Sequence, residues 1–283
     1  MAENVAPKED AQYAIPTRID HIGRIVVPVK LNDRGPFRLM LDTGATHSTI
    51  TKGTAEQLNL NASIVDTTSV QGVMGRVDAP VARISELRAG SLKLNDLTMP
   101  IMDGAVVNEL DGILGVEGLG NKVVTADFIN DRIRISDSTS ARRARGYAVV
   151  KFQLVSNRLI VVDAMVDRCP VRAVIDTGGS DTVGNLALFK ALTEGKRSRT
   201  STTEMRMVDI TNTSRDGHLL LVPKIKLDVA TITNAAVVTG DFEIFRVWKL
   251  DDRPALLIGM DVLGQLGELS IDYKRQELWV LER

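Results

Sequence analysis

One stretch of the sequence occurs twice, and this duplication restricts the folds available to the chain more than any other feature. An apolar run ends in Asp42-Thr43-Gly44 in the first copy and in Asp176-Thr177-Gly178 in the second, 134 residues later. In both copies this run follows another apolar segment and an Asp-Arg-x-Pro turn, at residues 33–36 and 167–170. The pattern is typical of a β-hairpin whose second strand ends in a tight glycine turn. Each copy therefore predicts a hairpin that presents one aspartate side chain.

A second pair of matching segments lies downstream of the two aspartates. Gly112–Gly120 corresponds to Leu256–Gly264, and each is followed by two short apolar segments that predict a closing pair of strands. The chain is therefore a duplication of one unit of about 120–135 residues, a period too long for a solenoid. Strand signals dominate, and the helices expected at residues 53–60 and 186–192 are short. The sequence thus predicts a mostly β protein.

The duplication also predicts the domain boundaries. We expect a flexible N-terminal tail at residues 1–17, because its first residues are polar and lack periodicity. We expect an N-terminal lobe at 18–138 with the first Asp-Thr-Gly, and a C-terminal lobe at 148–283 with the second. Residues 139–147, which include Arg142, Arg143 and Arg145, are interpreted as a solvated linker, with a basic docking or processing site as the alternative. Lys196–Arg199 predicts a charged loop in the second lobe.

Composition excludes several classes of function. The chain has 35 Lys and Arg against 36 Asp and Glu, a net charge of −1, so no strong field favours nucleic acid or an anionic membrane as a partner. No apolar run approaches the ~20 residues of a membrane span, so we expect no membrane insertion. Cys169 is the only cysteine, which excludes an intrachain disulfide and a cysteine metal cluster. His21 and His218 have no partners at ligand spacing, so we expect no metal and no cofactor.

The two Asp-Thr-Gly motifs, a glycine-tipped hairpin at residues 72–75 and the downstream apolar-Gly segments together resemble the aspartic peptidases. Leu41–Ala45 and Asp176–Val183 are most similar to the retroviral-type (retropepsin) branch, in its bacterial form. Retropepsins carry one such unit per subunit, whereas here two units lie in one chain, as in the pepsin branch. The resemblance implies a bilobal acid-protease fold with two homologous β-barrel-like lobes and short helices. It also implies an active site complete within one chain, and hence a monomer.

The resemblance further implies roles for individual residues. Asp42 and Asp176 correspond to the catalytic pair of the family. The residues that would support them in the two turns are Thr43, Gly44, Ala45, Thr177, Gly178 and Gly179. The tip of a flap that covers the substrate would consist of Gly72, Val73, Met74 and Gly75. His47 and Asp181, five residues past the aspartates, correspond to positions that line the substrate groove, and solvent-facing polar residues are the alternative interpretation.

Two aspartates held side by side can share one proton. At a separation of about 3 Å, repulsion between two charged carboxylates is roughly 5–6 kcal/mol at an effective dielectric constant near 20. The pair therefore holds one proton between its members, and the ionised one can activate a water while the other donates to a substrate carbonyl. The pepsin branch usually has Ser or Thr after Asp-Thr-Gly, but here Ala45 and Gly179 have no side-chain donor. We therefore expect a mildly acidic pH optimum.

Together these features predict an aspartic endopeptidase that hydrolyses peptide bonds in extended protein segments. Two alternatives stay open: a non-catalytic peptide-binding protein of the same fold, and a non-proteolytic enzyme that uses the acid pair on a small molecule. No charged segment leads into an apolar one near residue 1, so no signal peptide is expected. The resemblance to exported bacterial proteins favours a periplasmic location, with the cytoplasm as the alternative.

Overall fold

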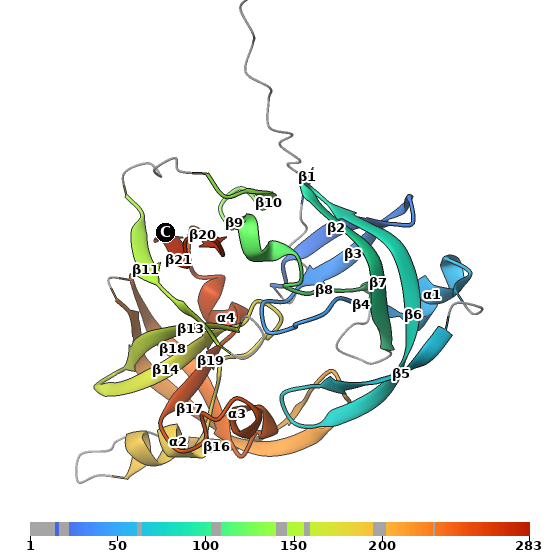
Figure 1. Ribbon diagram of the computed structural model, residues 1–283. Helices are drawn as coiled ribbons and strands as arrows, with labels where there is room; N and C mark the ends of the chain where they lie inside the picture. The colour runs from blue at the N-terminus through green and yellow to red at the C-terminus, as the bar shows by residue number, and fades with distance from the viewer. Residues whose placement is uncertain are drawn as a thin grey trace, which may run out of the picture.

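The computed structural model describes residues 15–16, 23–60, 64–102, 109–139, 146–155, 159–194, 202–228 and 230–283. Most of the expected tail, the arginines of the expected linker and the loop Lys196–Arg199 lie outside these residues, as does His21. Two sheet-built lobes stand side by side in Figure 1, and a third sheet joins them. This arrangement confirms the predicted mostly β, two-lobed fold.

The first lobe is built on a seven-stranded sheet in the order β2-β3-β8-β4-β7-β6-β5. Its strands are β2 (Val26–Leu31), β3 (Arg34–Leu41), β4 (Thr49–Thr51), β5 (Ile64–Gln71), β6 (Arg76–Ala89), β7 (Leu92–Met102) and β8 (Gly112–Leu114). A further pairing between β2 and β6 curls the sheet towards a barrel. Phe37, Leu39 and Leu41 are buried while Arg38 is exposed, as the alternation along β3 predicts.

The second lobe repeats this plan with an eight-stranded sheet in the order β12-β13-β14-β19-β15-β18-β17-β16. Its strands are β12 (Gln153–Val155), β13 (Leu159–Val166), β14 (Cys169–Ile175), β15 (Val183–Gly184), β16 (Thr202–Val208), β17 (Ser214–Leu227), β18 (Ala230–Gly240) and β19 (Ala255–Ile258). The strand before each aspartate pairs in parallel with the downstream apolar-Gly segment: β3 with β8, and β14 with β19. The two repeated sequence features are therefore neighbours in space in both lobes.

The sheet that joins the lobes has six strands in the order β1-β10-β9-β20-β21-β11. They are β1 (Ile15–Pro16), β9 (Lys122–Asp127), β10 (Arg132–Asp137), β11 (Ala148–Lys151), β20 (Glu268–Asp272) and β21 (Glu277–Leu281). At its centre β9 of one lobe pairs with β20 of the other, and the hydroxyls of Thr125 and Ser270 hydrogen-bond across the pair at 2.8 Å. Ile15 and Pro16, which fall within the expected tail, pair with β10, because the edge of that strand offers free backbone groups.

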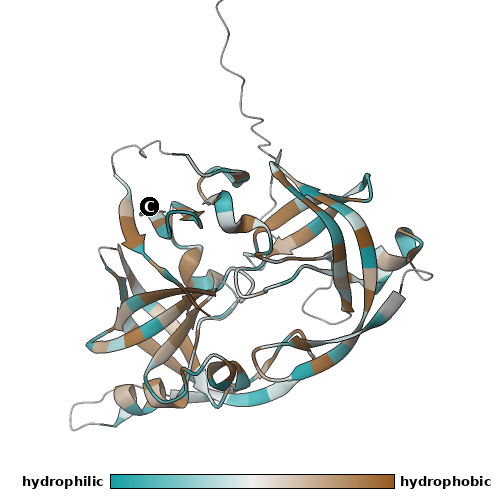
Figure 2. Cartoon of the chain, viewed as in Figure 1, coloured by the Kyte–Doolittle hydropathy of each residue, from teal (hydrophilic) through white to brown (hydrophobic). Residues whose placement is uncertain are grey.

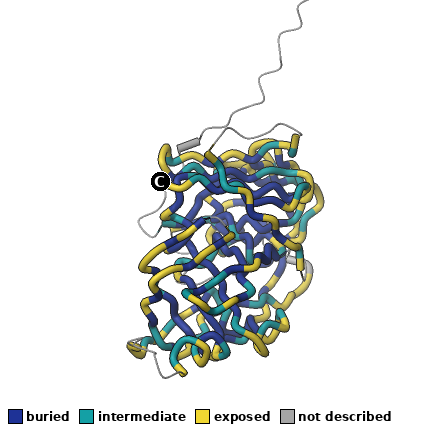
Figure 3. Tube along the Cα trace, turned by 90° about the vertical axis from the view of Figure 1, so that its left-hand side faces the viewer, coloured by how far each residue is buried: buried dark blue, intermediate teal, exposed yellow. Residues whose placement is uncertain are grey.

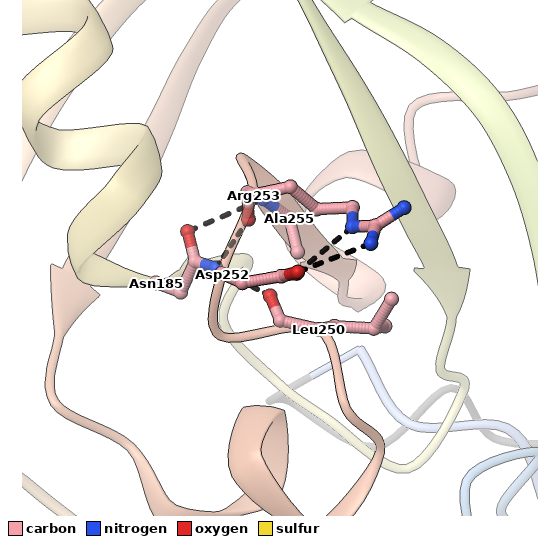
Figure 4. A network of polar contacts seen from close by, with 5 residues as sticks. All are labelled: Asn185, Leu250, Asp252, Arg253 and Ala255. Atoms are coloured by element: carbon pink, nitrogen blue, oxygen red, sulfur yellow. Dashed lines mark hydrogen bonds and ion pairs between the residues drawn. The ribbon is translucent and has the colours of Figure 1, made fainter.

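In the described residues, short α-helices connect the strands: α1 (Lys52–Gln57), α2 (Leu186–Thr193), α3 (Glu243–Val247) and α4 (Met260–Leu263). α1 ends earlier than the expected residue 60, because Asn59 adopts a left-handed conformation with φ of 59°. The Asn185 side chain caps α2 by accepting from the Leu188 N–H at 2.9 Å. Its amide also donates to the carbonyls of Leu250 and Arg253, each at 2.7 Å, and so fixes the approach to β19 (Figure 4).

One large apolar core runs through both lobes and the joining sheet. Hydrophobic and hydrophilic residues alternate along the strands in Figure 2, and the buried segments of Figure 3 form a continuous interior. Three smaller clusters among the described residues are separate from this core, and one of them consists of Leu159, Val161 and Val174. The first-lobe cluster consists of Val26, Met40, Leu110 and Ile113. The second-lobe cluster contains Val183, Val238, Phe242, Ile244, Phe245, Ala255 and Leu257. Within the described ranges, no helix is long and apolar enough to span a membrane.

Candidate active site

The two aspartates lie at equivalent points of the two lobes. Asp42 directly follows β3 and Asp176 directly follows β14. The backbone N–H of Asp42 donates to the carbonyl of Leu114, and that of Asp176 donates to the carbonyl of Ile258, each at 3.0 Å. Each parallel strand pair thus continues up to the aspartate itself, which fixes where its side chain begins.

The two threonines of the motifs interlock the turns across the lobes. The Thr43 hydroxyl donates to the carbonyl of Ile175 at 2.7 Å, and the Thr177 hydroxyl donates to that of Leu41 at 2.8 Å. In return, the Thr43 N–H donates to the Thr177 hydroxyl at 3.1 Å, and the Thr177 N–H donates to the Thr43 hydroxyl at 3.0 Å. Both threonines are fully buried, so these bonds do not compete with water. They set the distance and orientation of the two aspartates.

The two carboxyl groups meet between these turns. Asp42 Oδ1 accepts from the N–H groups of Gly44 at 2.7 Å and Ala45 at 3.0 Å, and Asp176 Oδ1 accepts from Gly178 N–H at 2.9 Å. A Cβ on Gly44 would lie 3.0 Å from Asp176 Oδ1 and 3.2 Å from Asp42 Oδ1. A Cβ on Gly178 would lie only 2.2 Å from the Asp42 carboxyl carbon. Glycine at position 178 is therefore needed for the carboxyl groups to come together, whereas at position 44 a side chain would only crowd them.

The environment of the pair favours its protonated form. Burial raises the pKa of Asp42 well above its ordinary value, and the charge of Asp176 and a hydrogen bond with it act in the same direction. Burial also raises the pKa of Asp176, although hydrogen bonds from Gly178 N–H and from Asp42 oppose the increase. Two facing carboxyls of this kind titrate as a unit. The pair therefore retains one proton at pH values where an isolated aspartate is ionised.

A further hydroxyl in each lobe ties the downstream segment to the turn. Ser48 Oγ accepts from Gly115 N–H at 3.1 Å, while Ser48 N–H donates to Glu117 Oε1 at 2.6 Å. In the second lobe, the Thr182 hydroxyl donates to Asp261 Oδ1 at 2.6 Å. Ser48 and Thr182 are fully buried and lie 134 residues apart, the same spacing as the aspartates. The sequence analysis missed them, although this spacing and their shared hydroxyl were visible.

The geometry agrees with the comparison of the sequence with protein families. A family model described as "Aspartyl protease" matches residues 27–118 and 162–262. The chain belongs to the aspartyl protease family. The two matched segments each contain one Asp-Thr-Gly and most of its downstream apolar-Gly segment, which confirms that the family unit is present twice.

This aspartyl protease chain was also compared with solved structures and with curated proteins. The structure is similar to the crystal structure of basic 7S globulin from soybean, with a TM-score of 0.49 and 8% sequence identity over 91% of this chain and 90% of that one. A search of curated proteins finds no sequence that matches.

The predicted flap tip of the aspartyl protease unit lies at the end of the β5–β6 hairpin. Gln71 and Arg76 form the last paired positions, and Gly72 N–H donates to the Gly75 carbonyl at 2.8 Å to close the turn. Met74, at the middle of the tip, is only 2% exposed, because it packs into the second-lobe cluster. Contact of this tip with substrate stays a prediction.

The second lobe has an equivalent hairpin that the sequence analysis did not identify. β16 and β17 pair as far as Val208 and Ser214, and residues 209–213 form the tip. This tip has no glycine. Asp209 Oδ1 instead accepts from the N–H and hydroxyl of Thr211 at 2.9 and 2.6 Å, and Asn212 supplies the left-handed residue with φ of 58°. The run of Asp, Thr, Asn and Thr was the available signal.

The two hairpin tips touch each other. Met74 N–H donates to Asp209 Oδ2 at 2.7 Å across the lobes. Figure 1 shows the β5–β6 hairpin approaching α3 and the β16–β17 hairpin, on the side of the molecule away from the joining sheet. Both tips therefore close the same side of the space between the lobes.

Two predicted positions remain, one in each lobe. His47 and Asp181 are exposed, and their contact with substrate stays a prediction. A cavity of about 470 Å³ lies on the second lobe, where Asp163, Arg172 and Arg253 are among its lining residues. None of its lining residues belongs to the turns or the hairpin tips, so we do not assign it to the site. In the described part of the chain no cluster of His, Cys, Asp or Glu side chains could hold a metal ion.

Proposed function

We propose that the chain is an aspartic endopeptidase in which Asp42 and Asp176 activate a water molecule between them. The observation that carries this proposal is the meeting of the two carboxyl groups across the lobes, held by the threonine interlock. A structural turn needs no second acid, whereas proton transfer in both directions needs one group to accept and one to donate. The raised pKa values of the pair support a singly protonated state under working conditions.

The reaction follows from that state. The ionised carboxylate takes a proton from the water, whose oxygen attacks the carbonyl carbon of the peptide bond. The protonated carboxyl gives its proton to the carbonyl oxygen, and a tetrahedral diol forms without a covalent bond to the protein. The carboxyl that took the proton from the water then gives it to the amide nitrogen. As the C–N bond breaks, one hydroxyl of the diol gives its proton to the other carboxylate, so the amine leaves, a carboxylic acid forms and the pair again holds one proton. Either aspartate can begin as the base, because the proton belongs to both.

The surroundings of the pair favour an extended peptide as substrate. The first-lobe cluster and the second-lobe cluster adjoin the two turns, and both are apolar. Two hairpins close the opposite side, so a substrate would lie between hairpin tips and turns along its length. The chain supplies both halves of this site, and we therefore propose that a monomer is active.

The test is digestion of a proteome-derived peptide library by the purified chain, with products identified by mass spectrometry at several pH values. Asp42→Asn and Asp176→Asn are each expected to abolish cleavage and to keep the native circular dichroism spectrum. Asp96→Asn is the matched control, since this aspartate is exposed and belongs neither to the two turns nor to the hairpin tips or the predicted groove positions. Cleavage by either pair variant at the wild-type rate would refute the assignment. Peptide binding without cleavage by the wild type would favour the non-catalytic alternative.

A further inference from the structure

Each hairpin tip reaches across to the apolar surface of the other lobe. Met74, from the first lobe, is part of the second-lobe cluster together with Val183 and Leu257. Ile210, from the second lobe, packs against the first-lobe cluster, which includes Met40 and Ile113. Met40 lies between Leu39 and Leu41 on β3 and faces the first-lobe cluster, where it is only 1% exposed. The chain thus fills both apolar surfaces with its own side chains.

These two surfaces lie directly beside the aspartate pair. Ala45, whose N–H binds Asp42, packs against the first-lobe cluster. On the other side, a Cβ on Gly179 would lie 3.2 Å from Asp176 Oδ2 and 3.3 Å from the Leu257 side chain. Side chains of a peptide bound at the pair would therefore be placed against the same surfaces that Met74 and Ile210 cover.

Two backbone hydrogen bonds and close packing hold the tips in place. Met74 N–H donates to Asp209 Oδ2 at 2.7 Å, and the Val73 carbonyl accepts from Ile244 N–H at 3.0 Å, near the start of α3. The tips also lie within van der Waals contact, because a Cβ on Gly75 would be 2.7 Å from the Thr213 hydroxyl. We call the interactions between residues 72–75 and residues 209–213 the tip contact; the Val73–Ile244 bond lies beside it.

Asp209 has a separate task for each of its two oxygens. Oδ1 accepts from the N–H and hydroxyl of Thr211 and from Thr213 N–H at 2.9, 2.6 and 3.3 Å, all within its own turn. Oδ2 accepts from Met74 N–H in the other lobe. Asp209 is 7% exposed, so the charged bond to Met74 is largely shielded from water. One side chain therefore shapes its own tip and holds the opposite one.

We propose that the resting chain blocks its own substrate site: Met74 and Ile210 occupy the positions of two substrate side chains, and Asp209 holds them there. A peptide can then bind only after the tip contact breaks. The statement about substrate rests on the proposed function, whereas the closed tips and the part played by Asp209 do not. The two can therefore be tested separately.

The first experiment measures how often the tip contact opens, without any substrate. Oxidation of methionines by hydrogen peroxide, followed by peptide mass mapping, reports the accessibility of Met74. Met99 is buried in the main core and Met165 is partly exposed, so these serve as slow and fast internal references. In the wild type Met74 should oxidise about as slowly as Met99. Oxidation of Met74 at the rate of Met165 would overturn the proposal.

Asp209→Asn tests the holding group selectively. The three donors around Oδ1 favour the amide oxygen of Asn at that position. The NH₂ group then faces Met74 N–H, so only the hydrogen bond between the two tips is lost. Loss of a hydrogen bond to a charged acceptor should raise the Met74 oxidation rate roughly tenfold or more. Asp216→Asn on the same hairpin is the control, because Asp216 is exposed. Equal Met74 rates in the two variants would refute the role of Asp209.

The second experiment locks the tips. Gly75→Cys and Thr213→Cys are combined in a Cys169→Ser chain, since a Cβ on Gly75 would lie 3.2 Å from Thr213 Cβ, near disulfide geometry. The thiols should pair on mild oxidation, peptide cleavage should stop, and a reductant should restore it. Failure of the thiols to pair, or undiminished cleavage by the oxidised chain, would overturn the proposal. Paired thiols and a shielded Met74 in a chain that never cleaves peptides would support the tip contact and refute the peptidase function.

Discussion

Removal of a single hydroxyl from the threonine interlock should cost more stability than its small size suggests. In Thr43→Val the side chain keeps its shape, but the Ile175 carbonyl loses its donor and the Thr177 N–H loses its acceptor. Both backbone groups stay buried, and each unsatisfied group costs about 1–3 kcal/mol. The free energy of unfolding should therefore fall by about 2–6 kcal/mol.

The assay is urea unfolding followed by the fluorescence of Trp248 and Trp279. Thr43→Ser is the first control: it retains the hydroxyl and should lose only about 1 kcal/mol for one methyl group. Thr193→Val is the second, because that hydroxyl makes one bond, to the Phe189 carbonyl, at a half-buried site at the end of α2. It should cost no more than about 1 kcal/mol. If Thr43→Val and Thr43→Ser unfold within about 0.5 kcal/mol of each other, the interlock does not carry the stability assigned to it.

Three further outcomes follow from the turns. The pH profile of kcat/KM should have its optimum in the mildly acidic range, and an optimum near pH 2–3 would contradict this expectation. Ala45→Ser should move both limbs of the profile towards acid, because its hydroxyl offers Asp42 a further donor. Burial raises the pKa of Asp42 in the folded chain, so at pH values above the ordinary pKa of an aspartate the need to ionise this group destabilises the fold. Asp42→Asn should therefore unfold at a higher urea concentration than wild type at pH 7, and the difference should vanish below about pH 4. Gly178→Ala should abolish cleavage, because its Cβ would displace the Asp42 carboxyl. Gly53→Ala should cleave normally, since its Cβ would have no neighbour nearer than 3.9 Å, and equal activity of the two variants would refute the close approach of Gly178 to Asp42.

The sequence was most informative where a local pattern was repeated. The hairpins that lead to Asp42 and Asp176 and the parallel pairing with the downstream segments follow from residue types at one fixed spacing. The β5–β6 tip was visible because glycines mark it. The tip at residues 209–213 uses Asp and Asn for the same turn, so it carries no glycine pattern that would mark it in the sequence.

Other features depend on contacts that no single segment encodes. From the sequence alone, a methionine in a loop such as Met74 is equally consistent with a substrate contact and with an exposed residue. Met74 is buried because it packs against residues of the opposite lobe. The pairing of Ile15 and Pro16 with β10 depends on a free strand edge, which two residues of sequence cannot reveal. Ser48 and Thr182 could have been found, because they obey the spacing of the repeat.

The joining sheet has a consequence for what would happen if the chain were divided between its two units. Each half would carry one aspartate and would expose the long open edge of β9 or β20, which are paired at the centre of the intact sheet. Free edges of this kind invite association with any available strand, so separate halves would risk aggregation as well as correct assembly. Because both units lie in one chain, β9 and β20 pair within one molecule, at a high effective concentration of each other. Duplication within one chain thus makes the assembly of the paired aspartates independent of how much protein a cell produces.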